Sequence, residues 1–336
     1  VNRYNRAVDP RTKVEVSYSV QRRPYYHRAL ASAVWGYSWG KGRNSSFVLR
    51  PADISVVKLR QVDSAFLNSL KNPYLRNSYT SQLIAGLSGS YIFNNQSRRV
   101  DRSSLMMRFN FETNGNLIDG LSRLFGSKER LADGEPYHRL FGIRYAQYFR
   151  IDANIAKKFV LAPKVSIVYR FYGGWGYAYG NSEVMPYSEQ FYIGGANSIR
   201  AFTIRSLGPG SYRPPTDDRN GYLDQTGDFK LEANIEYRFG IMGRLNGAVF
   251  LDAGNIWLLK KDPKRPGAEL KWKGFLNDIA LGTGFGLRYD ISYLVIRADL
   301  GIGLHTPYPN PDKKGYYNIS SFKDGLGFHL AIGYPF

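Results

Sequence analysis

The sequence of 336 residues has no cysteine, only four histidines and four methionines, and no long apolar run. Without cysteine it can form no disulfide framework, no thiolate metal site and no cysteine nucleophile. A membrane-spanning helix needs about 20 consecutive apolar residues, and no stretch approaches that length. No histidine has a second one at metal-ligand spacing, and no Gly-x-Ser-x-Gly turn joins a strand to a helix. We therefore predict no enzyme: no catalytic residue, no metal and no cofactor.

The chain is instead rich in residues that favour strands, with 26 Tyr, 20 Phe and 35 Gly. Its last twelve residues, GLGFHLAIGYPF, alternate between large apolar and mostly small side chains. Successive side chains of a strand point to opposite faces, so a period of two predicts a strand. The large residues that would share one face are Leu326, Phe328, Leu330, Ile332, Tyr334 and Phe336. The same alternation recurs in about twelve segments, among them 229–239, 279–289 and 294–304.

The length of these segments distinguishes between classes of β protein. They run for about ten to fifteen residues, whereas strands of globular proteins usually have about five or six. A tilted strand that crosses a bilayer needs roughly 9–11 residues. One apolar face opposite a face of Gly, Ser, Arg, Asp and Glu is typical of transmembrane β-barrels. A water-soluble sandwich is the alternative, but it rarely needs such long strands. The pattern predicts an all-β fold, a transmembrane antiparallel β-barrel with about 12 strands in this chain.

The connections support this interpretation, because short and long ones alternate. The predicted short turns are 94–101, 153–162, 240–244 and 290–292. The predicted long loops are 59–77, 116–136, 179–226, 258–277 and 305–323. Outer-membrane barrels have short periplasmic turns and long outer loops, so the pattern places the C-terminus on the periplasmic side of the bacterial outer membrane. Aromatic residues near the strand ends are expected to form an interfacial girdle: Tyr177, Tyr179, Trp257, Tyr289, Tyr334 and Phe336.

The net charge of +19 first suggests nucleic acid as a partner. Nucleic-acid binding would need basic residues interleaved with stacking aromatics on one exposed platform. Here the aromatics fall on the opposite face from most of the strand arginines, such as Arg170, Arg288 and Arg297. Phosphates at the membrane surface and a polar lumen account better for the charge. We therefore expect outer-membrane lipids or lipopolysaccharide as partners, and no nucleic acid.

The longest loop, about 179–226, is the most informative one. It holds the stretch FYIGGANSIRAFTIRSLGPGSYRP, which is unusually apolar for an exposed loop. Gly194 and Gly195 give its backbone access to positive φ angles. Arg200 stands among apolar neighbours, and a charge away from bulk water is costly unless it is paired. We infer that the loop folds into the lumen, where Arg200 pairs with Glu236 or Asp252 on the strands that follow.

These residues also carry a family resemblance. The stretches GGANSIRAF, GDFKLEANIEYRF, VFLDAGNIW and the terminal GYPF resemble the BamA/TamA superfamily of outer-membrane assembly barrels over at least 191–336. In that family an Arg-Gly-Phe motif in the long loop enters the lumen and contacts acidic residues on the two following strands. Arg200 and Phe202 match the Arg and Phe of the motif, and Glu236 and Asp252 match the acidic partners. Ala201 replaces the central glycine. The ending IGYPF and the Tyr-rich, basic composition resemble TamA-like members from Bacteroidetes.

The resemblance implies a barrel of sixteen strands, of which this chain would be the C-terminal part. The first four strands, the POTRA repeats and the signal peptide are then expected upstream of Val1. A complete twelve-stranded barrel is the alternative, because an even strand number is allowed.

The resemblance also implies a seam at which the last strand pairs weakly with the first and can open sideways. Glycine weakens a strand interior, so Gly325, Gly327 and Gly333 are assigned to this seam strand. Phe336 resembles the C-terminal signal that assembly machinery reads.

The implied function is an outer-membrane protein assembly and insertion factor. It would template client barrels at the seam without covalent chemistry, since an unpaired strand edge can accept another strand. The implied partners are client outer-membrane proteins and periplasmic or lipoprotein accessory subunits. The alternatives are a two-partner secretion transporter and a passive porin. A barrel enzyme would need a His and a Ser or Asp that meet at one rim.

Overall fold

The structure is a computed structural model that describes residues 10–23, 26–62, 81–96, 102–125, 127–130, 136–213, 225–291, 293–310, 317–319 and 325–336. Within these ranges the regular secondary structure is almost all β-strand, with one short α-helix and one 3₁₀ turn. No helix in the described ranges is both long and apolar enough to cross a membrane.

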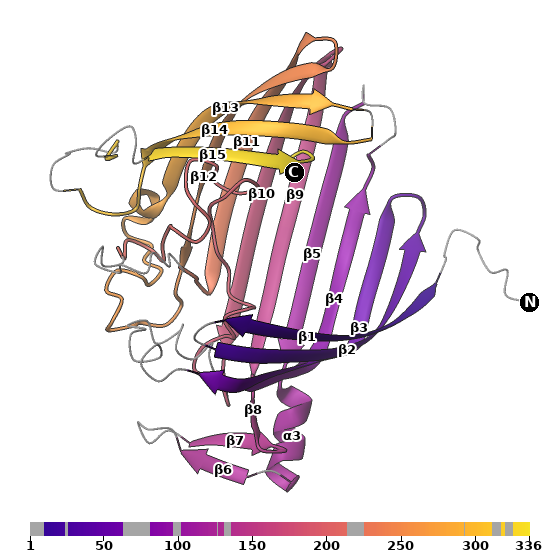
Figure 1. The fold of residues 1–336 in the computed structure, drawn as a ribbon, viewed down its shortest axis with the longest axis vertical. Coiled ribbons are helices and arrows are strands. Elements are labelled where there is room, and N and C mark those ends of the chain that lie inside the picture. Colours follow the sequence, from indigo (N-terminus) through magenta and orange to yellow (C-terminus); the bar gives the residue numbers. More distant parts are fainter. Residues whose placement is uncertain are drawn as a thin grey trace, which may run out of the picture. The chain divides into compact units, whose positions relative to one another are not determined.

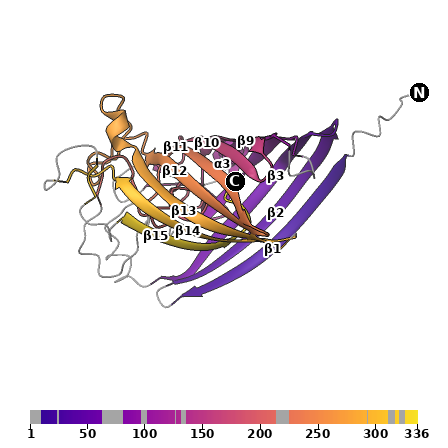
Figure 2. The ribbon, with the colours of Figure 1, turned by 90° about the horizontal axis from the view of Figure 1, so that it is seen from above.

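Twelve strands follow one another in sequence order along the hydrogen-bonded sheet. They are β1 (Arg11–Arg23), β2 (Tyr26–Lys41), β3 (Ser45–Val62), β4 (Gln82–Asn94), β5 (Ser104–Asn114), β9 (Tyr148–Ala162), β10 (Val165–Ala178), β11 (Phe229–Met242), β12 (Leu245–Trp257), β13 (Ala280–Asp290), β14 (Val295–His305) and β15 (Leu326–Ile332). From β1 to β4 and from β10 to β15, consecutive strands of this order pair antiparallel. Figure 2 shows β13, β14 and β15 following one another in this order. The predicted strand number and the all-β antiparallel class are confirmed.

The chain divides into two compact units. Unit 1 comprises Val1–Phe93, Arg108–Asp152 and Gly176–Gln190, and unit 2 comprises Asn94–Met107, Ala153–Trp175 and Phe191–Phe336. Unit 1 contains β1 to β4 and the insertion between β5 and β9, whereas unit 2 contains β11 to β15 (Figure 1). The division passes through β5, β9 and β10, and each unit is described by itself.

The insertion that follows β5 departs from the predicted loop 116–136. It contains the helix α3 (Asn116–Phe125) and the short strands β6 (Ser127–Arg130), β7 (Pro136–Leu140) and β8 (Ile143–Tyr145). Residues 138–152 alternate in the sequence as one strand would, but they do not form one strand. A turn at Phe141 and Gly142, both with positive φ, separates β7 from β8, and β9 begins only at Tyr148.

Two predicted connections were placed wrongly. Residues 153–162 are not a turn but the second half of β9, whose alternation continues to Ala162 before the turn at Lys164. The predicted loop 59–77 starts within β3, which runs to Val62, and the rest of that loop lies outside the described residues. β3 continues as a strand through Pro51, where its pairing with β4 shifts register between Arg50 and Asp53.

The aromatic girdle is only partly as predicted. Tyr177, Tyr289 and Tyr334 are 41%, 48% and 42% exposed, as expected for side chains at the outside. Trp257, however, is fully buried. Its indole stacks on Phe275 of the 3₁₀ turn η1 (Phe275–Asp278) at 4.9 Å between ring centroids. This turn, at the end of the predicted loop 258–277, covers the Trp257 ring. The strand pattern alone could not indicate that contact.

Candidate functional site

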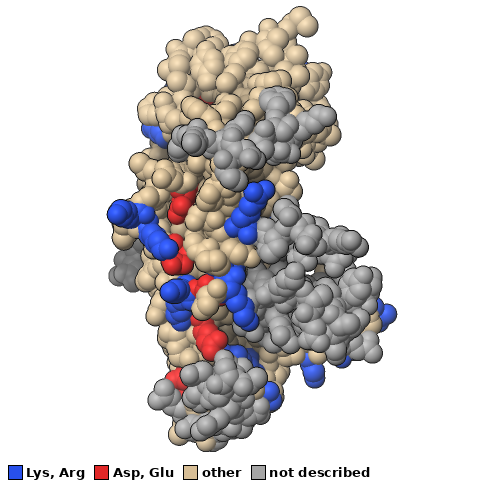
Figure 3. Space-filling view, turned by 90° about the vertical axis from the view of Figure 1, so that its left-hand side faces the viewer, with Lys and Arg blue, Asp and Glu red and all other residues tan. Residues whose placement is uncertain are grey.

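The polar side chains of the strands in unit 2 are buried on one face of the sheet, which we call the inner face. On β11, Glu232, Asn234 and Glu236 are at most 1% exposed. Ile235 and Tyr237, which alternate with them along the strand, are 42% and 41% exposed. This alternation separates an inner polar face from an outer apolar face. The inner face continues over Asp252 of β12, Arg288 of β13, and Arg297 and Asp299 of β14. Acidic and basic side chains lie next to one another on the face of the molecule shown in Figure 3. The buried charges of the inner face are tolerable because each has a partner of opposite sign.

The loop that docks on this face is closed by its own backbone hydrogen bonds. The described residues 191–213 of the predicted loop 179–226 form a compact turn, and 214–224 lie outside the described residues. Gly194 and Gly195 have φ angles of 95° and 89°, in the left-handed region that favours glycine. The Gly195 amide donates to the Phe202 carbonyl at 2.8 Å, and the Arg205 amide donates to the Ile193 carbonyl at 2.9 Å. The two glycines thus reverse the chain so that Arg200 stands at the tip.

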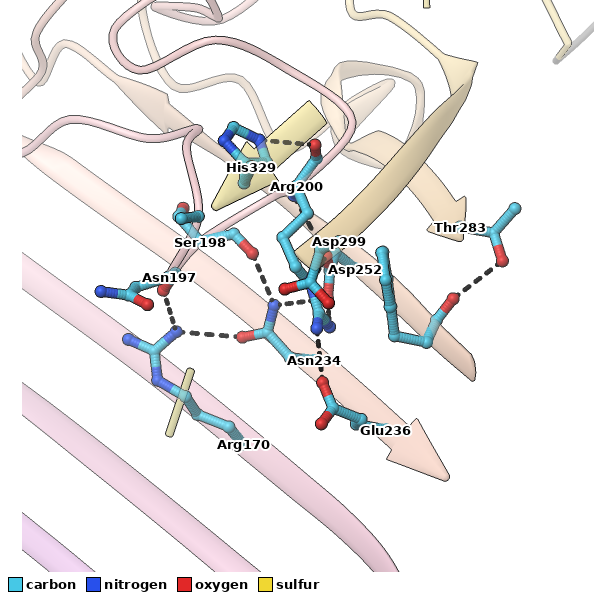
Figure 4. Close-up of polar contacts among 12 residues, drawn as sticks. Arg170, Asn197, Ser198, Arg200, Asn234, Glu236, Asp252, Thr283, Asp299 and His329 are labelled. Atoms are coloured by element: carbon cyan, nitrogen blue, oxygen red, sulfur yellow. Dashed lines mark hydrogen bonds and ion pairs between the residues drawn. The ribbon is translucent and has the colours of Figure 1, made fainter. Parts of the chain in front are cut away.

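Arg200 lies completely buried between two carboxylates (Figure 4). Its Nε and Nη2 donate to the two oxygens of Asp252, both at 2.8 Å, and its backbone amide donates to Asp252 Oδ2 at 3.1 Å. Its Nη1 contacts Glu236. The guanidinium also lies over the Phe250 ring, 3.4 Å from the centroid. Arg200 therefore engages Asp252 in the bidentate geometry that makes arginine–carboxylate pairs specific.

The charge of Arg200 is secure in this position. Burial alone would lower the pKa of its guanidinium, but the hydrogen bonds and charge of Asp252 and the charge of Glu236 raise it above its ordinary value. Glu236 is shared with two further cations: Arg238 Nε lies 2.8 Å and Arg288 Nη2 lies 3.3 Å from its oxygens. Glu236 is therefore the junction of the inner-face network.

A second set of contacts holds the loop beside Arg200. Asn234 donates both to the Ser198 carbonyl at 3.0 Å and to Asp252 Oδ1 at 2.9 Å. Ser198 Oγ donates to Glu232 Oε2 at 2.6 Å. Arg170 of β10 contacts Glu232 and donates to Asn234 Oδ1 at 3.0 Å. Because these contacts involve both the backbone and the side chains of the loop, they fix the orientation of the loop on the sheet.

The last two strands receive the loop through glycines. Gly301 of β14 and Gly327 of β15 are register partners. A Cβ atom at either position would overlap the Arg200 carbonyl oxygen. Gly282 of β13 has the same role, since a Cβ there would lie 2.6 Å from Ala201 Cβ. We call Gly282, Gly301 and Gly327 the glycine seat. It lets the loop backbone approach the sheet more closely than any side chain would allow.

Phe202 and Ala201 belong to the apolar side of this contact. Both are buried, in a cluster with Phe191, Ile193 and Ile199 of the loop. The non-glycine residues with positive φ in the described chain are Phe141, Lys164 and Arg205. Ala201 is therefore in an ordinary backbone conformation, which alanine adopts without strain.

The four residues assigned to the seam strand do not share one role. β15 is Leu326–Ile332, so Gly325, Gly333 and Phe336 lie outside it, and only Gly327 is within it. Gly333 has a φ of 85° and turns the chain, which ends the alternation. As a result Phe336 leaves the apolar outer face: its ring lies 5.8 Å from the guanidinium carbons of Arg200 and Arg238. The prediction that Phe336 shares the face of Leu326 to Ile332 was wrong for this reason.

The charged residues of this site bind the loop to the sheet. The described residues include no group of three or more His, Asp or Glu side chains placed to hold a metal ion. The carboxylates of the inner face are instead directed at arginines. What the arrangement can do is hold a loop against the last strands, or release it.

A family model described as the Omp85 superfamily domain matches residues 3–336. The chain belongs to the Omp85 superfamily. Two curated relatives of this Omp85 chain are called outer membrane protein assembly factor BamA. One, from Neisseria meningitidis serogroup B, is 27% identical over 116 residues, 33% of this chain and 14% of the relative. The other, from Nitratidesulfovibrio vulgaris, is 31% identical over 136 residues, 38% of this chain and 16% of the relative.

The fold of the Omp85 chain also resembles a solved structure, BamA from Haemophilus ducreyi lacking POTRA domains 1–3. The TM-score is 0.56 at 16% identity, over 96% of this chain and 58% of that chain. This likeness supports an outer-membrane β-barrel fold. The matched regions span less than two thirds of each of these relatives.

Sequence reasoning missed several residues of the site. Asn234 and Ser198 were not singled out; Asn234 follows the alternation of β11, whereas Ser198 lies in the loop, where no such pattern exists. His329 was not singled out either, and its Nε2 donates to the Arg200 carbonyl at 2.9 Å. Gly301 and Gly282 carry a signal, since glycines recur at every second position of β13 and β14. That regularity indicates a close backbone approach from the inner side.

Proposed function

We propose that the chain is the barrel part of an outer-membrane protein assembly and insertion factor. In this proposal β15 offers its free edge to an incoming strand of a client barrel, without covalent chemistry. The observation that carries the proposal is the docking of the Arg200 loop on β15 itself, through Gly327 and His329. The Omp85 family and the BamA relatives support it further.

The edge strand has properties suited to this task. β15 is short, with seven residues. Within the described residues its hydrogen-bonded neighbour is β14, so its other edge has backbone groups available for pairing. Its outward side chains are apolar and exposed, with Phe328, Leu330 and Ile332 at 64%, 71% and 72%. An exposed strand edge of this kind is a template for β-augmentation.

In this proposal, docking of the Arg200 loop controls whether the edge strand β15 can move. When it is seated, Arg200 is paired with Asp252 and Glu236, and its carbonyl is held by His329. Seating therefore fixes β15 in one position relative to β11 and β12. Release of the loop would free β15 to bend or separate. The remaining parts of the proposal are a C-terminus toward the periplasm, contact with lipopolysaccharide, accessory lipoproteins, and upstream strands and POTRA repeats.

A crosslinking experiment tests the proposal. Phe328→Cys places a thiol on the edge strand, and Phe285→Cys is a matched control on β13, which is flanked by β12 and β14. Both side chains point outward, at 64% and 54% exposure. In the full-length protein, we expect only Phe328→Cys to form a disulfide with a cysteine in the terminal strand of a client barrel during its insertion.

Equal crosslinking from both positions, or from neither, would contradict the template mechanism. Single-channel recording distinguishes the alternative of a passive porin. A porin conducts steadily, whereas a barrel with its loop docked inside is expected to flicker.

A further inference from the structure

The helix α3 lies on the outside of the sheet in unit 1. Ile118 of the helix packs in one cluster with Leu140 of β7 and Tyr145 of β8, and Leu83 and Ala85 of β4 border this cluster. Figure 1 shows α3 beside β7 and β8, after the end of β5. The side of β4 on which Leu83 and Ala85 lie therefore determines where the helix is.

That side is the outer one. Ile84, between Leu83 and Ala85, packs in a different cluster with Ala146 and Tyr148. Tyr148 in turn donates to Glu112 Oε1 at 2.5 Å, within the polar contacts of the inner side. Because neighbouring side chains of a strand point to opposite faces, Leu83 and Ala85 face outward.

A second observation on the neighbouring strand agrees. Gly89 has the same parity on β4 as Leu83, and a Cβ at Gly89 would overlap the Phe111 ring of β5. Phe109 and Phe111 are both 41% exposed. These two rings belong to the outer apolar surface that faces lipid in a β-barrel. The helix is thus on the same side of the sheet as the lipid-facing rings.

Polar contacts attach one side of the helix to the end of the sheet. Tyr145 Oη donates to Asp119 Oδ1 at 2.7 Å and lies 3.0 Å from Ser122 Oγ. Asn116 Nδ2 donates to Thr113 Oγ1 of β5 at 2.9 Å. The Gly115 amide donates to the Ala85 carbonyl at 2.9 Å, directly before the helix begins. The helix is therefore held where β5 ends, at the level where a spanning strand leaves the bilayer.

The opposite side of the helix is apolar and exposed. Leu117, Leu121 and Leu124 are 79%, 49% and 75% exposed. Their spacing of four and three residues places them on one helical face. Beside Leu140, Phe141 at the turn between β7 and β8 is 91% exposed, and it holds a φ of 52° that is unfavourable for a bulky residue. The fold thus presents three leucines and an aromatic ring outward.

We propose that this leucine face is a membrane anchor that lies in the headgroup and acyl boundary of the outer membrane. The face continues the lipid-facing surface of Phe109 and Phe111 beyond the end of β5. A helix with one attached polar side and one outward apolar side is the form taken by interfacial helices. Exposed aromatics beside such a helix are common at the level of the headgroups. This inference depends on the barrel lying in a membrane and not on its role in assembly.

Depth-dependent fluorescence quenching tests the anchor. The 336 residues contain no cysteine, so Leu121→Cys introduces a thiol for an environment-sensitive fluorophore. The full-length protein is reconstituted in phosphatidylcholine vesicles that contain either a lipid with a shallow doxyl group or no quencher. Unmodified protein treated identically gives the background. Asn44→Cys is the control, because Asn44 lies in the exposed turn between β2 and β3.

We expect the shallow doxyl lipid to quench the fluorophore at residue 121 severalfold more strongly than at residue 44. Aqueous iodide should quench residue 44 severalfold more strongly than residue 121. Adding Leu117→Asn and Leu124→Asn to the Leu121→Cys protein should reverse the pattern at residue 121, with the heat-modifiable migration of the folded barrel unchanged.

Two results would overturn the proposal. Free access of iodide to residue 121, without lipid quenching, would mean that the leucine face lies in water. Protection from both iodide and lipid quencher would mean that a protein, such as a second copy of the chain, covers it.

Discussion

The Nε2 atom of His329 donates a hydrogen bond to the backbone carbonyl of Arg200 at 2.9 Å, across 129 residues of sequence. The side chain of Arg200 is meanwhile held by Asp252 and Glu236. One loop residue is thus attached to β11 and β12 through its charge, and to β15 through its backbone. The two attachments can be removed separately.

Removal of the Arg200 side chain should destabilise the docked loop more than removal of the backbone attachment. Arg200→Ala leaves Asp252 and Glu236 buried with fewer cationic partners, and breaking a buried pair commonly costs about 3–5 kcal/mol. We expect faster proteolysis within 191–210 and weaker assembly activity. The control is Arg205→Ala, which removes a half-buried arginine from the same loop outside the carboxylate pair. Unchanged protease resistance and activity in Arg200→Ala would eliminate the latch.

Removal of the hydrogen bond from His329 to the Arg200 carbonyl should destabilise the docked loop less. His329→Phe keeps an aromatic ring but leaves the buried Arg200 carbonyl without this donor, a loss of about 1–3 kcal/mol. We expect hydrogen exchange to rise in 198–203 and in β15, whereas Arg200 remains paired with Asp252. His329→Gln retains an N–H donor and should restore part of the protection. Equal exchange in wild type and His329→Phe would show that the bond does not hold β15.

The glycine seat predicts a steric effect. In Gly327→Ala or Gly301→Ala the new methyl group overlaps the Arg200 carbonyl oxygen, so the loop must shift away from the sheet. We expect both variants to loosen 191–210 in limited proteolysis. Gly173→Ala on β10 is a matched control, because its Cβ would make ordinary contacts, the nearest at 3.5 Å from Phe171. If all three variants behave alike, strand weakening by glycine explains these residues better than loop docking.

Glu189 predicts a pH dependence in the loop of unit 1. Burial, followed by the negative charge of Glu112, raises the pKa of its carboxyl above 4.5, against the opposing charge of Arg150 and with a further small contribution from Asp53. The folded state therefore binds this proton more tightly than the unfolded state. Its contribution to stability is complete below pH 4.5 and is lost as the pH rises through the higher folded pKa.

Hydrogen exchange of 183–190 as a function of pH measures this effect. We expect protection to fall as the pH is raised above 4.5, and Glu189→Gln to remove that part of the fall. Glu183→Gln, in the same segment but exposed, should leave the profile unchanged. A profile that is identical in wild type and Glu189→Gln would disprove the assignment.

Strands and their faces could be predicted from the sequence because the period of two is a local property. A β-strand has to present alternate residues to lipid and to the inner face, so β11 and β13 show it directly. The pairing of Arg200 with a carboxylate could also be proposed, since a buried charge needs a partner. Which carboxylate it takes could not, and the structure brings Arg200 into contact with both Glu236 and Asp252.

The features that the sequence did not indicate depend on contacts between distant segments. α3 lies within the predicted loop 116–136, which was assigned to a loop because it is rich in Gly, Asn and charged residues. Its leucines are exposed, so they do not mark a core as apolar residues usually do. Gly327 was assigned to strand weakening, because the approach of Arg200 to it has no local signature. Phe336 was placed outward by alternation, which holds only while the backbone is extended, and Gly333 ends that extension.

The distance in sequence between Arg200 and His329 also has a consequence for the order of folding. Gly327 and His329 lie on β15, the last strand of the described sheet, so these two contacts of the loop form only after β15 has been made. A truncated barrel can pair Arg200 with Asp252, but it cannot seat the loop backbone on β15. Complete seating of the loop therefore depends on the presence of β15.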